Sequence, residues 1–115
     1  MLGQPLQPAV HTRAGFGRHL QYLDAGADLV EIRAGDALQT LASNLPDHID
    51  LVLLDGAKSL YPQILALLEP RLRQGALIVA DNADWCPEYL SRVRTAGNGY
   101  LSVPFAADVE LSFKL

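Results

Sequence analysis

The sequence lacks the features that mark several large protein classes. It has one cysteine, Cys86, so no disulfide can form within the chain, and a reducing compartment such as the cytoplasm is expected. No apolar run approaches the roughly 20 residues that a membrane-spanning helix needs. The nine Lys and Arg residues form no basic stripe and the formal net charge is -4, which argues against nucleic acid and anionic membranes as partners.

The length and composition fit one small folded domain. The chain has 115 residues, of which 50% are hydrophobic, and this is enough for a modest core. Residues 1–15 contain two prolines and little periodicity, so we expect a flexible N-terminal arm there. Residues 16–115 are expected to form an α/β domain.

Beyond the arm, helix patterns alternate with strand patterns. They predict, in order, helix 16–25, strand 29–34, helix 37–45, strand 49–55, helix 61–72, strand 75–82, helix 87–94 and strands 99–105 and 109–115. Leu51–Leu54 is apolar without alternation, as in a parallel strand covered on both faces. Pro70 is expected to kink its helix or end it early. The order predicts a three-layer open α/β sheet with helices on both faces and a C-terminal antiparallel hairpin.

Polar side chains stand where two buried strands end. Asp55 follows the first of these strands, and Asp81 and Asn82 follow the second. Because ligands of open α/β sheets bind outside the carboxyl ends of the strands, we expect these side chains to converge. Carboxylate and amide oxygens are the ligands that Mg²⁺ or Ca²⁺ prefers. The alternative is purely structural: Asp55 caps the following helix, and Asp81 and Asn82 form a turn.

Lys58 lies three residues beyond Asp55, at the mouth of the same loop. Near a bound dication and an apolar wall its pKa would fall, and the side chain could then act as a general base. The alternative is a solvated loop lysine, the usual state of a single lysine.

The segment "DLVLLDGAKSLY…LLEPRLRQGALIVADNAD" resembles the class I S-adenosylmethionine-dependent O-methyltransferases of the catechol O-methyltransferase type. The resemblance runs from about Leu20 to Leu115. It implies a Rossmann-like methyltransferase fold and metal-assisted methyl transfer from S-adenosylmethionine to a small-molecule hydroxyl.

The resemblance also assigns roles to residues by their positions in the family's motifs. It implies that Mg²⁺ or a similar cation is held by Asp55, Asp81 and Asn82, and that Lys58 takes the proton from the substrate hydroxyl. It further implies that the cofactor is bound by Asp36, Ala37 and Asp55, with the "GDAL" turn beside the adenine.

Other parts of the family pattern are missing. We find neither the acidic, glycine-rich loop after a first strand nor the acid after a second strand that hold the cofactor in that family. We therefore expect a domain truncated at its N-terminus, without its first two strands, that is weakly active or inactive as this isolated chain. The alternative function is a non-catalytic remnant that self-associates and could bind a divalent metal.

The missing strands also bear on assembly. They would leave Leu51–Leu54 with a long, apolar, unpaired edge. We expect either that residues 29–34 pair with this edge or that a second copy covers it, giving a homo-oligomer or strand exchange.

Two further comparisons concern acids at strand ends. The family places a carboxylate near the C-terminal hairpin to grip its substrate, and the acids available here are Asp108 and Glu110, neither of which aligns with it. Glu110 alternates with apolar neighbours and is expected on a solvated strand face. A third alternative is a phospho-receiver domain, in which a buried strand also ends in an acid, as "DLVLLD" does here. It is less favoured because the chain lacks that domain's acidic pair and its Lys-Pro dipeptide.

Overall fold

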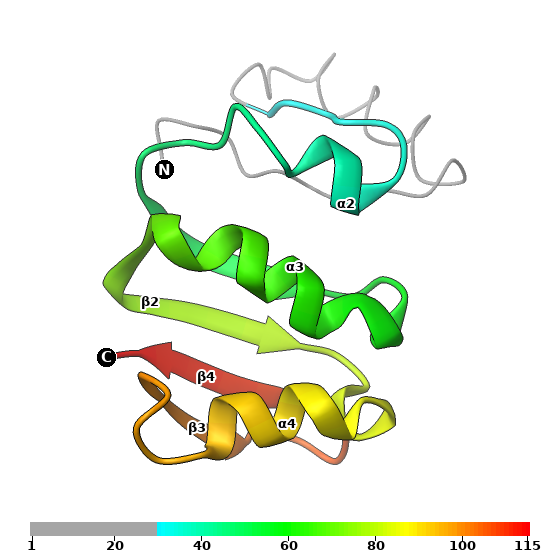
Figure 1. Ribbon diagram of the computed structural model, residues 1–115. Coiled ribbons are helices and arrows are strands. Elements are labelled where there is room, and N and C mark those ends of the chain that lie inside the picture. The colour runs from blue at the N-terminus through cyan, green and yellow to red at the C-terminus, as the bar shows by residue number, and fades with distance from the viewer. Residues whose placement is uncertain (1–29) are drawn as a thin grey trace.

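The computed structural model describes residues 30–115 and shows an open α/β sheet with helices packed on it (Figure 1). Its elements, in chain order, are α2 (Ala37–Thr40), β1 (Ile49–Leu54), η1 (Lys58–Leu60), α3 (Tyr61–Leu68), η2 (Glu69–Arg71), β2 (Leu72–Ala80), η3 (Ala83–Trp85), α4 (Pro87–Arg94), β3 (Tyr100–Pro104) and β4 (Glu110–Lys114), where η marks short 3₁₀ turns. The predicted arm 1–15 and helix 16–25 lie outside the described residues.

The four strands form one mixed sheet in the order β1-β2-β4-β3. β1 and β2 are parallel, while β4 runs antiparallel to both β2 and β3. The predicted α/β class is therefore confirmed, and so is the C-terminal hairpin. In Figure 1 both α3 and α4 lie in front of the sheet, on the same side.

The core fills the space between these two helices and the sheet. Tyr61 and Leu65 of α3, Tyr89 and Val93 of α4, and Ile78 of β2 have no exposed surface. The rings of Tyr61 and Tyr89 meet edge to face with their centroids 5.7 Å apart, an arrangement that aromatic pairs favour.

β1 is covered on one face only within the described part of the chain. Val52 and Leu54 are buried toward the helices, whereas Leu51 and Leu53 are 47% and 62% exposed. The structure thus differs from the expectation that Leu51–Leu54 is covered on both faces, although the parallel pairing of the strand is as predicted.

β2 begins earlier than predicted because it carries an irregularity. Ile49 pairs with Leu72, but Leu51 already pairs with Leu77, so the β2 strand contains extra residues between the two pairs. Gly75 lies in this stretch with φ +90°, a conformation that side chains with a Cβ rarely adopt.

The strand predicted at 29–34 is wrong for its described residues, 30–34, which are not in a strand. The guanidinium of Arg33 donates hydrogen bonds to the carbonyl oxygens of Thr40 (2.9 Å), Ser43 (3.0 Å) and Asn44. The segment is therefore held against the end of α2, whose last carbonyls lack helical partners. It does not pair with the edge of β1.

The helix predicted at 37–45 is present only as the single turn α2. The Asp36 side chain caps its start by accepting a hydrogen bond of 3.0 Å from the backbone nitrogen of Leu38. The helix ends at Thr40 and is followed by Ser43 and Asn44, whose side chains compete for backbone hydrogen bonds and disfavour helix. Asn44 has φ +59°, which a continuing helix could not accommodate.

The two remaining helices follow their sequence signals. α3 ends at Leu68, and Pro70 lies in the 3₁₀ turn that follows, which confirms the expected early end. α4 spans Pro87–Arg94, as predicted. Among the described residues, no helix has the length and hydropathy needed to cross a bilayer.

Candidate functional site

Asp55 and Asp81 follow neighbouring parallel strands and lie at the same edge of the sheet. Leu54 pairs with Ala80 at the ends of β1 and β2, so the next residues along the two strands are the two acids. The backbone nitrogen of Asp81 also donates to the Leu54 carbonyl oxygen over 2.8 Å, which continues the pairing into the site. The structure thus brings these two predicted site residues together.

Asp55 lies close enough to Asp81 to change the pKa of its carboxyl group. The pKa of Asp81 is raised above its ordinary value, first by the neighbouring carboxyl group of Asp55, then by burial, and then by the negative charges of Asp55 and Asp108. Two carboxylate charges held near each other repel. A divalent cation in the same place would relieve that repulsion, so the pair fits a cation by its chemistry.

Asn82 follows Asp81 directly in the chain, just beyond the end of β2. Its backbone is left-handed, with φ 53° and ψ 38°. Its side-chain nitrogen Nδ2 donates to Oδ2 of Asp108 over 2.6 Å. Because the amide nitrogen is bound to Asp108, the amide oxygen Oδ1 is the atom that Asn82 can offer to a cation.

Within the described residues, no three His, Cys, Asp or Glu side chains form a group that could hold a metal ion. A cation at this edge would therefore depend on the two carboxylates, the Asn82 amide oxygen and water. That set is compatible with Mg²⁺, which keeps several water ligands and commonly binds one or two carboxylates.

Lys58 lies beside Asp55, as the sequence suggested. Its Nζ is 3.5 Å from Oδ1 of Asp55 and donates to the hydroxyl oxygen of Tyr61 over 3.0 Å. The Tyr61 hydroxyl in turn lies 2.9 Å from the carbonyl oxygens of both Leu54 and Asp81, to which it donates. Only 16% of the Lys58 side chain is exposed, so it is not a freely solvated loop lysine.

The pKa of Lys58 is raised above its ordinary value by the protein groups around it. Burial acts to lower it, but the hydrogen bond and charge interaction with Tyr61 and the negative charge of Asp55 outweigh burial. The fall in pKa expected near a dication is therefore not a property of the protein groups alone. It would require positive charge at the Asp55–Asp81 edge.

The positions of Asp36 and Ala37 say little about their predicted role in cofactor binding. The carboxylate of exposed Asp36 is used as the cap of α2, and Ala37 is the first residue of that helix and half-buried. The role of both in cofactor binding stays a prediction.

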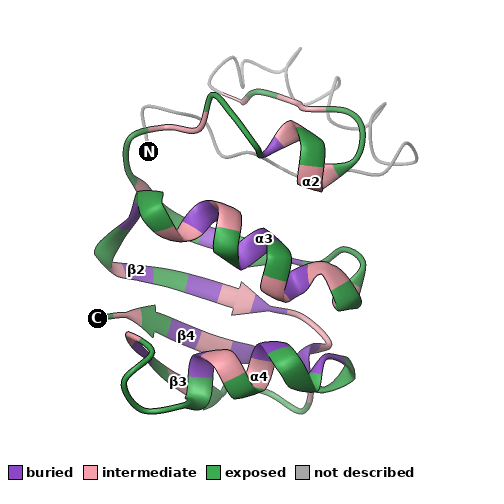
Figure 2. Cartoon of the chain, in the orientation of Figure 1, coloured by how far each residue is buried: buried purple, intermediate pink, exposed green. Residues whose placement is uncertain are grey.

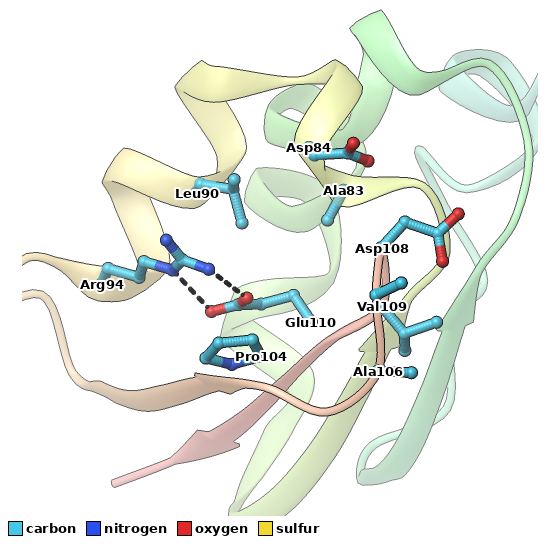
Figure 3. A pocket seen from close by; sticks show the side chains of 10 residues that line it. Ala83, Asp84, Leu90, Arg94, Pro104, Ala106, Asp108, Val109 and Glu110 are labelled. Atoms are coloured by element: carbon cyan, nitrogen blue, oxygen red, sulfur yellow. Dashed lines mark hydrogen bonds and ion pairs between the residues drawn. The ribbon is translucent and has the colours of Figure 1, made fainter.

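The hairpin acids lie differently from the expectation. Glu110 is 2% exposed and accepts two hydrogen bonds from the Arg94 guanidinium, at 2.8 and 2.6 Å, so its predicted place on a solvated face is wrong. Figure 3 shows this pair facing a small pocket beside Asp108. The pocket has a volume of about 40 Å³, which suits water rather than a substrate.

Comparison with solved structures shows the same fold. A protein from Klebsiella pneumoniae assigned as an O-methyltransferase superposes with a TM-score of 0.69 at 20% sequence identity, covering 94% of this chain and 60% of that one. A protein from Staphylococcus aureus assigned as a caffeoyl-CoA O-methyltransferase superposes with a TM-score of 0.68 at 19% sequence identity, covering 91% of this chain and 62% of that one. The fold is that of the Rossmann-like methyltransferases.

A methyltransferase from Geobacter sulfurreducens has the same fold, with a TM-score of 0.64 at 23% identity, covering 85% of this chain and 50% of that one. The chain thus spans between half and two thirds of the length of these methyltransferase structures. No protein-family model and no curated protein sequence matches it.

Sequence reasoning considered Asp108 as a possible substrate-gripping carboxylate but did not predict its contact with Asn82. Its side chain accepts from Asn82, and its carbonyl oxygen accepts from the backbone nitrogen of Ala83 over 3.0 Å. It lies 26 residues from Asn82, in the connection between β3 and β4. Its motif did not align with the family, so the only available signal was an acid in a connection leading to the sheet edge of the site.

Proposed function

We propose that this chain is a metal-assisted O-methyltransferase domain that uses S-adenosylmethionine to methylate a small-molecule hydroxyl. The observation that carries the proposal is the position of Asp55 and Asp81 next to each other at the carboxyl ends of the parallel strands β1 and β2, with Lys58 3.5 Å from Asp55. Solved proteins assigned as O-methyltransferases with this fold support the reaction class. The free, buried Cys86 favours a reducing cytoplasm as the place of action.

In this proposal the cation is held by Asp55, Asp81 and the amide oxygen of Asn82. A divalent ion bound there would supply positive charge, which would stabilise the oxyanion of the substrate hydroxyl. The protein groups supply the position: the register of β1 and β2 fixes the two carboxylates, and the hydrogen bond to Asp108 orients the Asn82 amide.

Lys58 is the group that would take the proton from the hydroxyl. Tyr61 holds its nitrogen at the sheet edge through the 3.0 Å hydrogen bond. Burial raises the pKa of Tyr61, so its phenol stays neutral and continues to accept from the lysine at neutral pH. Neutralising the charge of Asp55 would remove one of the interactions that favour the lysine ammonium, and the amine could then serve as a base.

The chain offers fewer residues suited to bind S-adenosylmethionine than to bind the cation. The carboxylate of Asp36 is occupied as a helix cap, and the sequence has no acidic, glycine-rich loop following a strand. We expect these 115 residues to bind the cofactor weakly, with correspondingly slow or undetectable methyl transfer.

The incomplete cofactor site favours a second candidate function. In it, the chain is a non-catalytic domain of methyltransferase fold that binds a divalent cation and associates with itself. The two functions share the cation site and differ in whether the cofactor binds.

Isothermal titration separates these possibilities. Mg²⁺ and Mn²⁺ are titrated into the full 115-residue chain, and S-adenosylmethionine is then titrated into the cation-loaded protein. We expect saturable cation binding that weakens at least tenfold in Asp55→Asn, because that variant removes one of two carboxylates. Cofactor binding at micromolar concentration supports the enzyme, while cation binding without cofactor binding supports the second candidate.

Asp47→Asn is the matched control. Asp47 precedes β1 at the end far from the site, its side chain is 91% exposed, and it pairs with Arg71 over 3.1 Å. This substitution removes the same charge and should leave cation affinity unchanged. A wild-type chain that binds no divalent cation, or one whose affinity falls equally in both variants, would rule out the proposed site.

A further inference from the structure

The face of the sheet turned away from α3 and α4 is apolar across all four strands. Strand pairing arranges its side chains in two rows that cross the sheet, the first being Leu51, Leu77, Phe113 and Leu101 and the second Leu53, Val79, Leu111 and Val103. We call these eight residues the open face. Figure 2 shows the alternation of buried and exposed positions that this arrangement produces along β2 and β4.

The hairpin strands turn their apolar side outward. In β4, Glu110 and Ser112 are buried toward the helices, while Phe113 is 42% exposed on the open face. In β3, Ser102 is half-buried and donates to Glu110 over 2.7 Å, whereas Leu101 is 62% exposed. A strand that faced water on this side would normally carry its polar residues there.

The exposed apolar area is large for a single chain of this size. Six of the eight open-face residues are between 36% and 62% exposed. With roughly 200 Å² for a fully exposed large side chain, they present on the order of 600 Å². The largest apolar patch on a monomer is usually about 300–600 Å², so the open face reaches the upper end of that range.

The area also approaches what a stable dimer needs. Phe105 and Leu115 are exposed and continue the alternation of β3 and β4 at the strand ends. They bring the apolar surface toward the ~800 Å² that each partner contributes to a standard interface.

The charge distribution favours contact between identical chains. The chain has a net charge of -4, so two copies repel where their charged surfaces meet. None of the eight open-face residues is Asp, Glu, Lys or Arg. An uncharged apolar sheet face can pack against a copy of itself without leaving a polar group unpaired.

We propose that the open face is the interface of a homodimer in which two copies of this chain pack sheet against sheet. Each copy contributes the same surface, as a two-fold axis requires. Sheets packed in this way lie about 10 Å apart with interdigitated side chains. The dimer buries the leucines and phenylalanine that the single chain leaves exposed.

The mass of the full chain in solution tests this proposal. Sedimentation equilibrium or light scattering at micromolar concentration should give twice the 12.5 kDa of one chain. Leu101→Glu on β3 and Leu53→Glu on β1 place a charge at opposite sides of the open face, and each should give the mass of one chain. Both leucines are 62% exposed, so circular dichroism of both variants should match that of the wild type.

Ala66→Glu is the control, since Ala66 is exposed on α3 and lies outside the open face. It should remain a dimer. A wild-type chain with the mass of one copy would overturn the proposal and leave the open face to another occupant. A dimer that persists in both leucine variants would also overturn it and would indicate pairing or strand exchange through the edge of β1. The two leucine variants are independent, so a folding failure in one leaves the other decisive.

Discussion

At the scale of single residues, the backbone of Asn82 and its hydrogen bond to Asp108 orient its side-chain amide at the edge of the sheet. Its left-handed backbone, with φ 53°, is one that asparagine tolerates better than most residues. The 2.6 Å hydrogen bond to Asp108 fixes which amide atom faces that acid. If Asn82 binds a cation through its oxygen, Asp108 positions that oxygen without touching the ion, as groups behind metal ligands commonly do.

Replacing Asp108 by alanine should weaken Mn²⁺ binding about ten- to a hundredfold, the usual cost of losing a group that orients a metal ligand. Titration calorimetry measures the affinity, and a thermal melt checks that the fold is kept. Asp108→Asn should retain much of the affinity, because its side-chain oxygen can still accept from Asn82.

Asp84→Ala controls for the loss of negative charge near the site, since Asp84 is an exposed acid two residues from Asn82. Equal losses of affinity in the Asp84 and Asp108 alanine variants would show that Asp108 acts through its charge alone.

At the scale of elements, the ion pair between exposed Arg94 and buried Glu110 ties α4 to β4. Glu110 accepts from Arg94 at 2.8 and 2.6 Å and from Ser102 at 2.7 Å. These interactions, the Arg94 hydrogen bond first, hold the pKa of Glu110 below its ordinary value of 4.5. The pair therefore contributes stability above the unfolded pKa and loses it as the pH falls through the lower, folded pKa.

Glu110→Gln should lower the free energy of unfolding by about 1–3 kcal/mol at pH 7, because it removes a charge-assisted hydrogen-bond acceptor. The difference from the wild type should shrink as the pH falls from 4.5 through the lower pKa of folded Glu110, where the folded protein takes up the proton. Urea denaturation at pH 7 and at pH 3 measures both quantities. Glu88→Gln, at an exposed position of α4, should change the free energy of unfolding little. A stability difference between Glu110→Gln and the wild type that stays constant with pH would contradict the role given to the Glu110 carboxylate.

Some helices and strands could be predicted from the sequence, and others could not. α4 and the C-terminal hairpin were predictable because their signals are local: Pro87 begins the helix, and alternation marks the strands. Residues 30–34 alternate like a strand but need a neighbouring strand, and Arg33 instead binds carbonyl oxygens after α2. A pattern of alternation therefore indicates a strand only where a partner strand is available.

The same limit applied to the site. The meeting of Asp55 and Asp81 followed from strand ends alone, since parallel neighbours bring their carboxyl ends together. The burial of Glu110 could not be predicted in this way. Alternation shows that the two faces of a strand differ, but it does not say which face the helices cover. In β4 the helices cover the polar face, and only the packing of α4 against the sheet reveals this.

On the scale of the whole molecule, the open face links stability to assembly. The helices bury one side of the sheet into a core that includes Leu65 and Ile78, while the other side leaves leucines such as Leu53 in water. A chain this short buries a smaller fraction of its surface than larger domains do, so covering a second face would add a substantial share of its stability. Association that buries the open face should then be coupled to folding.

This coupling predicts a melting temperature that depends on protein concentration. Mass action favours the folded dimer as the concentration rises, so the melting temperature should increase across about a hundredfold range of concentration. In Leu101→Glu, which charges the open face, the melting temperature should be lower and independent of concentration. Differential scanning calorimetry at several concentrations measures both effects. A wild-type melting temperature that stays constant over that range would show that the folded chain gains nothing from a second copy.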